Sequence, residues 1–288
     1  MLKKRIVASL VVKEGVVVQS IGFDKYLPVG KPAIAVEFLT TWGIDEIVLL
    51  DISASRMRRG PDYEMIRNAA KKCFVPLTVG GGITEVGHIQ DLMHCGSDKV
   101  SLNQSAIYQP GLITEAAEIF GNQCVVVSID AVQTDKGYRV YDYISKTPLE
   151  ISPADMAKKT EDLGAGEIFI NSVDRDGSYR GYDMELIKSV CEKVSVPVIA
   201  CGGAKNAGDM IKILKDTNIS AACAGNFFHF TEHSVNTSKA NIIKQVDVRL
   251  ETFADYTDTD FDQDLRIRKK SDKVLEEMLY IRIEKEVI

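Results

Sequence analysis

Short runs of apolar residues alternate with amphipathic segments along most of the chain. The apolar runs are four to eight residues long and rich in Val and Ile, which is typical of strands buried on both faces of a parallel sheet. The predicted strands are residues 5–12, 46–51, 75–79, 98–102, 124–130, 167–171, 197–201 and 220–224. The predicted helices are residues 31–43, 60–73, 84–95, 110–120, 152–164, 182–193, 205–215 and 236–244.

Eight strand–helix units in this order predict an α/β fold, the (βα)8 TIM barrel. An internal repeat supports this prediction. Residues 75–82 match 196–203, residues 42–47 match 163–168, and residues 7–11 match 126–130, at an offset that stays near 120. Three matches in one register predict a barrel built from two duplicated half-barrels.

The pattern changes near residue 252, so we expect a barrel over residues 1–251 and a C-terminal extension over residues 252–288. An acidic and aromatic stretch (255–262) is followed by a basic one (266–270) and then by an amphipathic one (274–280). Charge-segregated extensions of this kind are usually solvated or contact a partner. No catalytic role is expected for it.

Composition narrows the class of protein. The 288 residues are 45% hydrophobic and 26% charged, as in an ordinary globular protein, and the net charge of −6 argues against nucleic-acid binding. With no apolar run long enough to span a bilayer and no signal-peptide pattern, we expect a cytoplasmic protein that does not bind membranes. Its six cysteines lack metal-site or disulfide spacing, so we expect free thiols and neither a metal nor a cofactor.

The loops that follow several strands carry residues suited to bind phosphate. Two Gly pairs, each before a helix, allow the backbone N–H groups to approach an anion, although tight turns alone would also require glycine. Because the repeat relates the two pairs, we favour a ligand with two phosphates across the barrel mouth. The predicted phosphate-binding residues are Gly81, Gly82, Asn103, Asp176, Gly202, Gly203, Gly225 and Asn226.

Asp130 is the candidate general acid or base. It ends the apolar run 125–129, so its carboxylate should emerge at the rim of the core, where burial can adjust its pKa for proton transfer. Asp51, Asp174 and Asp176 also fall at the mouth, the last two within a segment that could equally be a turn. The repeat partner of Asp130 is Val11, which has no ionisable group.

The chain from about residue 2 to 250 resembles the cyclase subunit of imidazole glycerol phosphate synthase. The motifs that carry the resemblance are Val-Gly-Gly-Gly-Ile at 79–83, Ser-Ile-Asp-Ala at 128–131, Ser-Val-Asp-Arg-Asp-Gly at 172–177 and Gly-Gly-Ala at 202–204. The family implies a barrel that receives ammonia from a glutaminase at its bottom face. The ammonia then meets a phosphoribulosyl-formimino substrate at the top, where two aspartates act, at the positions of Val11 and Asp130.

The departures from the family are concentrated at the top face. Val11 replaces the first catalytic aspartate, and Gln19 replaces a substrate-binding lysine. Asn171 replaces a threonine beside the site, and Cys201 replaces a serine beside the second phosphate. Loss of one acid–base carboxylate typically lowers a rate by about 10²–10⁴, so we expect ring closure to be lost.

The bottom face keeps the pattern of the family. The resemblance implies a gate of four charges that sum to zero, and two further residues that contact the glutaminase. The gate residues are Arg5, Glu46, Lys99 and Glu167, and the glutaminase-interface residues are Asp98 and Arg249. Charges at this end of a barrel usually serve stability, which is the simpler alternative.

These observations lead to one main hypothesis and two alternatives. The main hypothesis is a paralogue that docks a glutaminase and channels ammonia, with a sugar amidotransferase as a further partner, toward amidation of a sugar in O-antigen or lipopolysaccharide synthesis. The first alternative is a working cyclase subunit of histidine biosynthesis in which Asp51 or Asp176 replaces the missing acid. The second is a module that binds a phosphorylated small molecule without catalysis.

Overall fold

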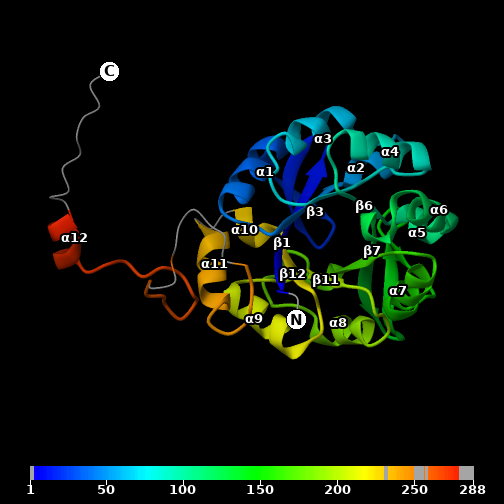
Figure 1. The fold of residues 1–288 in the computed structure, drawn as a ribbon. Coiled ribbons are helices and arrows are strands. Elements are labelled where there is room, and N and C mark those ends of the chain that lie inside the picture. Colours follow the sequence, from blue (N-terminus) through cyan, green and yellow to red (C-terminus); the bar gives the residue numbers. More distant parts are fainter. Residues whose placement is uncertain (1–2, 230–232, 250–255, 257–258, 279–288) are drawn as a thin grey trace, which may run out of the picture.

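The computed structural model describes residues 3–229, 233–249, 256 and 259–278 (Figure 1). Within them, eight parallel strands form a closed barrel. Every barrel strand pairs in parallel with both of its neighbours, and the circle is completed by β1 with β12 and by β7 with β10. The barrel strands are β1 (Arg5–Lys13), β4 (Glu46–Asp51), β5 (Leu77–Gly80), β6 (Lys99–Leu102), β7 (Val125–Thr134), β10 (Glu167–Ser172), β11 (Val198–Cys201) and β12 (Ala221–Ala224). The predicted (βα)8 barrel is confirmed.

Eight helices surround the strands (Figure 1), and each falls within or close to a predicted range. Local sequence explains several of their starting points. Asp62, Ser152, Asp183 and Asn206 each accept a hydrogen bond from a backbone N–H of the first turn, which satisfies a donor that the helix leaves free. The helices are α1 (Pro32–Thr41), α3 (Tyr63–Ala70), α4 (Val86–His94), α6 (Gly111–Phe120), α7 (Pro153–Asp162), α8 (Met184–Cys191), α9 (Ala207–Asp216) and α11 (Ser234–Ile242).

Additional elements follow the strands, and the sequence patterns did not predict them. All but η1 lie on the side of the barrel where the strands end. They are β2 (Val16–Ile21), β3 (Lys25–Gly30), α2 (Ile52–Arg56), α5 (Gln104–Tyr108), η1 (Asn122–Cys124), β8 (Gly137–Asp142), β9 (Thr147–Pro148), η2 (Val173–Arg175) and α10 (Asn226–His229). These segments are short and lack a full hydrophobic period, which is why periodicity misses them.

The additional elements repeat between the two halves of the chain. A pair of antiparallel strands follows both β1 and β7, a short helical turn follows both β4 and β10, and a short helix follows both β6 and β12. The long elements keep the same spacing, since β4 and β10 begin at residues 46 and 167 and α3 and α8 at 63 and 184. The structure therefore has the two-half organisation that the internal repeat predicted.

The apolar side chains form two separate clusters. The larger cluster lies between the strands and the surrounding helices. The smaller one fills the inside of the barrel, as expected when side chains alternate between the two faces of each strand. Its buried members are Val7, Val48, Val126, Phe169, Ile199, Cys201, Ala221 and Cys223. This interior layer separates the two polar ends of the barrel.

The described part of the extension packs partly on the barrel. Phe261 and Ile267 form an antiparallel bridge, and Leu265 packs against the barrel core. The helix α12 (Asp272–Met278) lies apart from the barrel (Figure 1). The predicted boundary at residues 251 and 252 lies outside the described residues and stays a prediction. None of the helices in the described part is long and apolar enough to cross a membrane.

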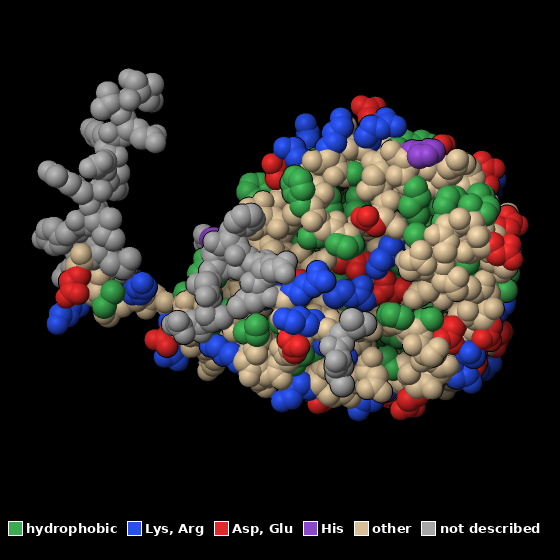
Figure 2. All heavy atoms as spheres, viewed as in Figure 1, with side chains coloured by type: hydrophobic (Ala, Val, Ile, Leu, Met, Phe, Trp, Pro, Cys, Tyr) green, Lys and Arg blue, Asp and Glu red, His purple; other side chains and the backbone are tan. Residues whose placement is uncertain are grey.

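The surface charges are mixed in sign on the face drawn in Figure 2. Several Lys and Arg side chains gather near the centre of this face, and acidic side chains lie around its rim. All six cysteines are free thiols, as predicted.

Candidate functional site

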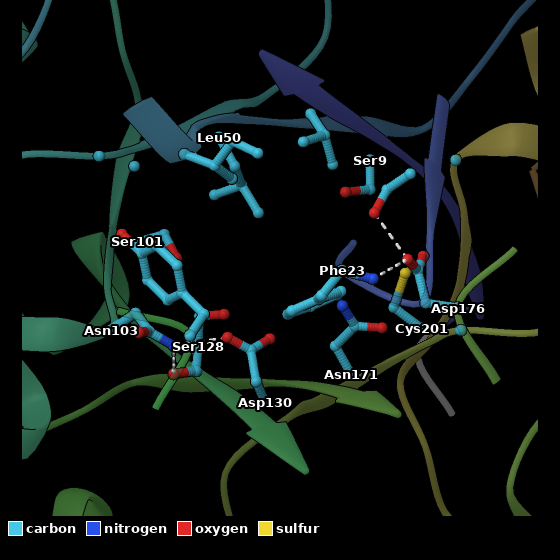
Figure 3. Close-up of a pocket in the computed structure, with 18 of the residues that line it drawn as sticks. Ser9, Phe23, Leu50, Ser101, Asn103, Ser128, Asp130, Asn171, Asp176 and Cys201 are labelled. Atoms are coloured by element: carbon cyan, nitrogen blue, oxygen red, sulfur yellow. Dashed lines mark hydrogen bonds between the residues drawn. The ribbon is translucent and has the colours of Figure 1, made fainter. Parts of the chain in front are cut away.

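A pocket open to solvent lies where the barrel strands end (Figure 3). All eight predicted phosphate-binding residues line it, together with Val11, Asp51 and Asp130. Asp174 does not line it, and its carboxylate instead accepts a hydrogen bond from the backbone of Gln133 at 2.8 Å. The loops that follow the strands of a barrel meet at one face, which explains why most of the predicted residues share one site.

Asp130 is the most perturbed acid of the pocket. Its side chain is only 7% exposed, and burial raises its pKa to about 7, with a further upward contribution from Asp176. Hydrogen bonds from Asn103 (Nδ2 to Oδ2, 3.1 Å) and Asn171 oppose this shift without cancelling it. A carboxyl group with a pKa near neutrality can both donate and accept a proton.

The two halves of the pocket differ at the positions that the repeat relates. In the second half, Asp130 pairs in register with Asn171 on β10. In the first half, Val11 pairs with Leu50 on β4, so two aliphatic side chains occupy the equivalent place. Figure 3 shows Leu50 across the pocket from Asp130 and Asn171. One wall can exchange protons with a ligand and the opposite wall cannot.

The glycines of the two pairs are required by the backbone itself. Gly82 and Gly203 have φ values of +72° and +96°, where residues with a side chain are strained. A Cβ atom would lie 2.5 Å from the carbonyl oxygen of Arg59 at Gly82, and 2.3 Å from that of Gly181 at Gly203. These close contacts explain the glycines as turn residues, so their role in phosphate binding stays a prediction.

Asp176 and Asn226 hold the hairpin β2–β3 in place, which the sequence did not indicate. The carboxylate of Asp176 accepts hydrogen bonds from Ser20 Oγ (2.6 Å) and from the backbone N–H of Phe23 (3.2 Å). The amide of Asn226 donates to the carbonyl of Ser20 (2.5 Å) and accepts from its N–H (3.2 Å). Because both side chains are engaged in this way, phosphate binding at these two positions would depend on the backbone.

The hairpin from the first half also meets the strands of the second half across the mouth. The rings of Phe23 and Tyr141 pack edge to face, with 6.4 Å between their centroids, and Lys146 Nζ lies 3.7 Å from Asp24 Oδ1. Gln19, at the position where the family has a lysine, donates to the hydroxyl of Tyr179 at 3.0 Å. The hairpin β2–β3 therefore partly covers the opening of the pocket.

Asp51 has a structural role in the same pocket. Its carboxylate caps α2 by accepting from the N–H of Ser53 at 2.9 Å and forms an ion pair with Arg59 at 2.5 Å. Among the described residues, no group of His, Cys, Asp or Glu is arranged to hold a metal ion.

At the opposite end of the barrel, the four predicted gate residues form one closed ring. Arg5 contacts Glu46 at 2.5 Å and also pairs with Glu167. Lys99 lies 2.9 Å from Glu46 and 2.7 Å from Glu167. Thr78 adds a hydrogen bond to Glu46 at 3.0 Å. Each cation bridges both carboxylates, so the ring is neutral and its charges are mutually satisfied.

Between the ring and the pocket, the interior is apolar at first and then polar. Above the interior layer, Ser9, Ser101 and Ser128 line the floor of the pocket (Figure 3). Each of these serines is at most 7% exposed, and the hydroxyl of Ser101 has no hydrogen-bond partner in the structure. A small polar molecule at this depth would meet a hydroxyl that is free to bond it.

The face around the ring carries the two predicted glutaminase contacts. Asp98 and Arg249 are exposed there, and the carboxylate of Asp98 accepts from the N–H of Leu77 at 2.8 Å. Phe74, which no sequence pattern singled out, lies in the connection into β5 on the same face and is 84% exposed. A fully exposed aromatic side chain can act as an anchor for a partner.

Comparisons with known proteins agree with this geometry. A family model described as "Histidine biosynthesis protein" matches residues 5–234. A Vibrio vulnificus (strain YJ016) protein named "Putative imidazole glycerol phosphate synthase subunit hisF2" is 43% identical over 263 residues, covering 91% of this chain and 97% of its own length.

Two further relatives are named "Imidazole glycerol phosphate synthase subunit HisF". The one from Methanopyrus kandleri is 40% identical over 263 residues (85% of this chain, 97% of its own length). The one from Bacillus cereus (strain G9842) is 42% identical over 253 residues (87% of this chain, 100% of its own length). This chain therefore belongs to the histidine biosynthesis protein family, as a barrel of the HisF cyclase-subunit type.

Proposed function

We propose that this barrel is a paralogue of the cyclase subunit that docks a glutaminase and conducts ammonia, while the ring-closing reaction is lost. One observation carries the proposal: the charge ring of Arg5, Glu46, Lys99 and Glu167 is complete, whereas Val11 stands opposite Asp130 in the pocket above it.

The barrel interior suits the passage of a neutral molecule. The ring has no net charge, and its side chains close the barrel interior at the end where the strands begin. These side chains must therefore move apart before a molecule enters from the glutaminase side. The layer above it contains aliphatic and small side chains such as Val48, Val126 and Ala221. Ammonia can cross such a layer as NH3, whereas ammonium would bear a large desolvation cost. Ser101 then offers the first hydrogen bond below the pocket.

At the mouth, Asp130 is left as the single acid for proton transfer. With a pKa of about 7 it can take up or release a proton beside bound ligand. General acid–base catalysis by two groups loses about 10²–10⁴ in rate when one is missing. Asp51 is occupied by Arg59, and Asp176 by Ser20 and Phe23, so neither is free to replace Val11 as an acid.

The nitrogen acceptor in this proposal is a sugar of surface-polysaccharide synthesis, such as O-antigen, bound by a separate sugar amidotransferase. The match to a relative named "Putative imidazole glycerol phosphate synthase subunit hisF2" over 97% of its length supports a HisF-type subunit. The pocket keeps both glycine pairs, which we propose bind a phosphorylated small molecule or help to dock the amidotransferase. The complex would work in the cytoplasm.

The decisive experiment is reconstitution with a glutaminase of the HisH type from the same organism. We expect a 1:1 complex in which glutamine hydrolysis is stimulated at least ten-fold. Phe74→Ala, on the ring face, should weaken the complex by about 2 kcal/mol or more, the effect of losing a hot-spot aromatic. Met57→Ala is the matched control, since Met57 is 55% exposed and follows α2 on the mouth side. Absence of a complex would refute the docking proposal.

A working cyclase subunit is the second candidate, because Asp130 and both glycine pairs remain in the pocket. A strain that lacks its cyclase subunit separates the two functions. We expect the wild-type protein not to restore growth without histidine, and Val11→Asp combined with Gln19→Lys to recover about 10²–10⁴ in cyclase rate. Growth on the wild-type protein would instead establish the second candidate.

A further inference from the structure

The rim of the mouth carries a large share of the exposed apolar side chains. Among the described residues, twelve large apolar side chains are exposed, and six of them lie in the segments that follow the barrel strands at the mouth. These six are Val16, Leu27, Met57, Tyr108, Ile144 and Tyr179. A single exposed apolar residue is ordinary, but six around one opening indicate a surface that contacts another molecule.

Three of these side chains lie along one arc of the rim. Met57 directly follows α2 after β4, Tyr108 ends α5 after β6, and Ile144 lies in the turn between β8 and β9. The strands β4, β5, β6 and β7 are consecutive neighbours in the barrel, and β8 pairs with β7. A hydrogen bond between Tyr143 and Ser55 joins the turn to α2. The arc is therefore one continuous surface built from three loops.

The buried carboxylate of Asp142 fixes two of the apolar side chains in place. It is 2% exposed and accepts hydrogen bonds from the hydroxyl of Tyr108 (2.8 Å) and from the backbone N–H of Ile144 (2.9 Å). Ser145 Oγ (2.7 Å) and Gln104 Nε2 (2.9 Å) donate to the same carboxylate. A surface that is ordered before binding loses less conformational entropy when a partner docks.

Two unpaired cations flank the arc. Arg56 and Arg58 stand on either side of Met57, and both are exposed. Neither forms an ion pair with a residue that the structure describes, whereas the neighbouring Arg59 is paired with Asp51. Apolar residues beside unpaired arginines suit a partner face that combines apolar side chains with carboxylates.

An open mouth would not serve the transfer of ammonia to a second protein. The pocket is open to solvent, and NH3 that enters water at neutral pH takes up a proton, because a simple amine such as that of lysine has a pKa of about 10.4. The ammonium ion is not a nucleophile. Delivery therefore requires that the opening is closed to water, and contacts around the edge of an interface exclude water from its centre.

We propose that this rim is the docking surface for the sugar amidotransferase, which places its ammonia entrance over the mouth and turns the pocket into a closed passage. The inference rests on the proposed function, because it concerns where the ammonia goes after the barrel. Tyr108 and Ile144 are the apolar anchors. Arg56 and Arg58 pair with carboxylates of the amidotransferase.

Binding of the sugar amidotransferase of the same organism to the full-length barrel, in complex with its glutaminase, tests the surface. We expect saturable binding on a biosensor. Ile144→Glu should weaken it at least about thirty-fold, the change that corresponds to the loss of a hot-spot side chain. Ile119→Glu is the matched control, since Ile119 is 61% exposed on α6, and it should bind as the wild type does.

The arginines are tested through the rate of association. Arg56→Gln combined with Arg58→Gln should slow association about ten-fold at low ionic strength and make it less dependent on salt, because unpaired cations at a rim attract an acidic partner. Unfolding midpoints establish that each variant is folded.

Hydrogen exchange locates the contact without any substitution. Backbone N–H groups of residues 52–58 and 142–147 should exchange more slowly when the amidotransferase is bound. Those of residues 111–120, in α6, should exchange at the same rate with and without it. Protection of α6 alone would contradict docking at the rim.

The wild-type barrel with the glutaminase alone separates this inference from the proposed function. If the glutaminase binds but the amidotransferase does not, the docking surface is refuted and glutaminase docking stands. The same conclusion follows if Ile144→Glu and Ile119→Glu bind the amidotransferase equally well. If the glutaminase itself does not bind, the proposed function fails.

Discussion

The two ends of the barrel contrast in how completely their charges are paired. At the end where the strands begin, Arg5 and Lys99 each contact two carboxylates, and the ring closes on itself. At the mouth, Asp130 faces the aliphatic pair Val11 and Leu50 and receives only amide hydrogen bonds. Buried charged groups at one end of the barrel therefore stabilise the fold, whereas the buried acid at the other end stays able to exchange a proton.

The difference shows which interactions can change without loss of the fold. Removing one member of the ring leaves an uncompensated buried charge, so its four residues depend on one another. An aliphatic residue at position 11 adds apolar contact in the pocket wall and removes one like charge from the neighbourhood of Asp130. The mouth can thus lose an acid with little structural cost, whereas the ring cannot.

Breaking the ring should have the largest effect on the free energy of unfolding. Glu46 is 1% exposed and contacts both cations, so Glu46→Gln should lower the free energy of unfolding by about 3–5 kcal/mol. Glu37→Gln, which breaks the exposed pair with Lys72, should cost at most about 1 kcal/mol. Urea denaturation at pH 7 measures both, and equal effects would contradict a stabilising ring.

The dependence of stability on pH tests the state of Asp130. Its pKa is about 7 in the folded protein and about 3.9 in the unfolded chain, so the folded state binds more protons between these values. Asp130 should therefore contribute a fall in stability of about 4 kcal/mol as pH rises from about 4 to 7. Burial lowers the pKa of His229 to about 4, which gives a slope of opposite sign, so the contribution of Asp130 is measured as the difference between the wild type and Asp130→Asn in denaturation series at several pH values. A difference that does not change with pH would contradict a raised pKa of Asp130.

A smaller effect is expected at the hairpin over the mouth. Ser20→Ala removes the hydrogen bond to Asp176 and should cost about 1–3 kcal/mol, because the carboxylate is left without that donor. The loss should appear as faster proteolysis within β2–β3. Thr134→Ala, which removes a hydroxyl bonded to Gly137 on the opposite side, is the control and should leave cleavage of β2–β3 unchanged.

Sequence periodicity was sufficient for the barrel but not for its mouth. The eight strands and eight helices bury continuous apolar faces, so their positions follow from local pattern, with errors of a few residues at the ends. The hairpin β2–β3 depends on hydrogen bonds to residues far away in the chain, such as the two between Ser20 and Asn226. The local hydrophobic pattern does not reveal hydrogen-bond partners that lie far away in the sequence.

The candidate site divides in the same way. The sequence alone determined the duplication and the absence of an acid at Val11, the repeat partner of Asp130, because both depend on residue identity at repeated positions. The four gate charges were implied by the resemblance to the cyclase-subunit family. Only the tertiary structure decided that the four charges form one closed ring and that Asp130 has a pKa near neutrality, because burial and pairing are set by strands far apart in the chain.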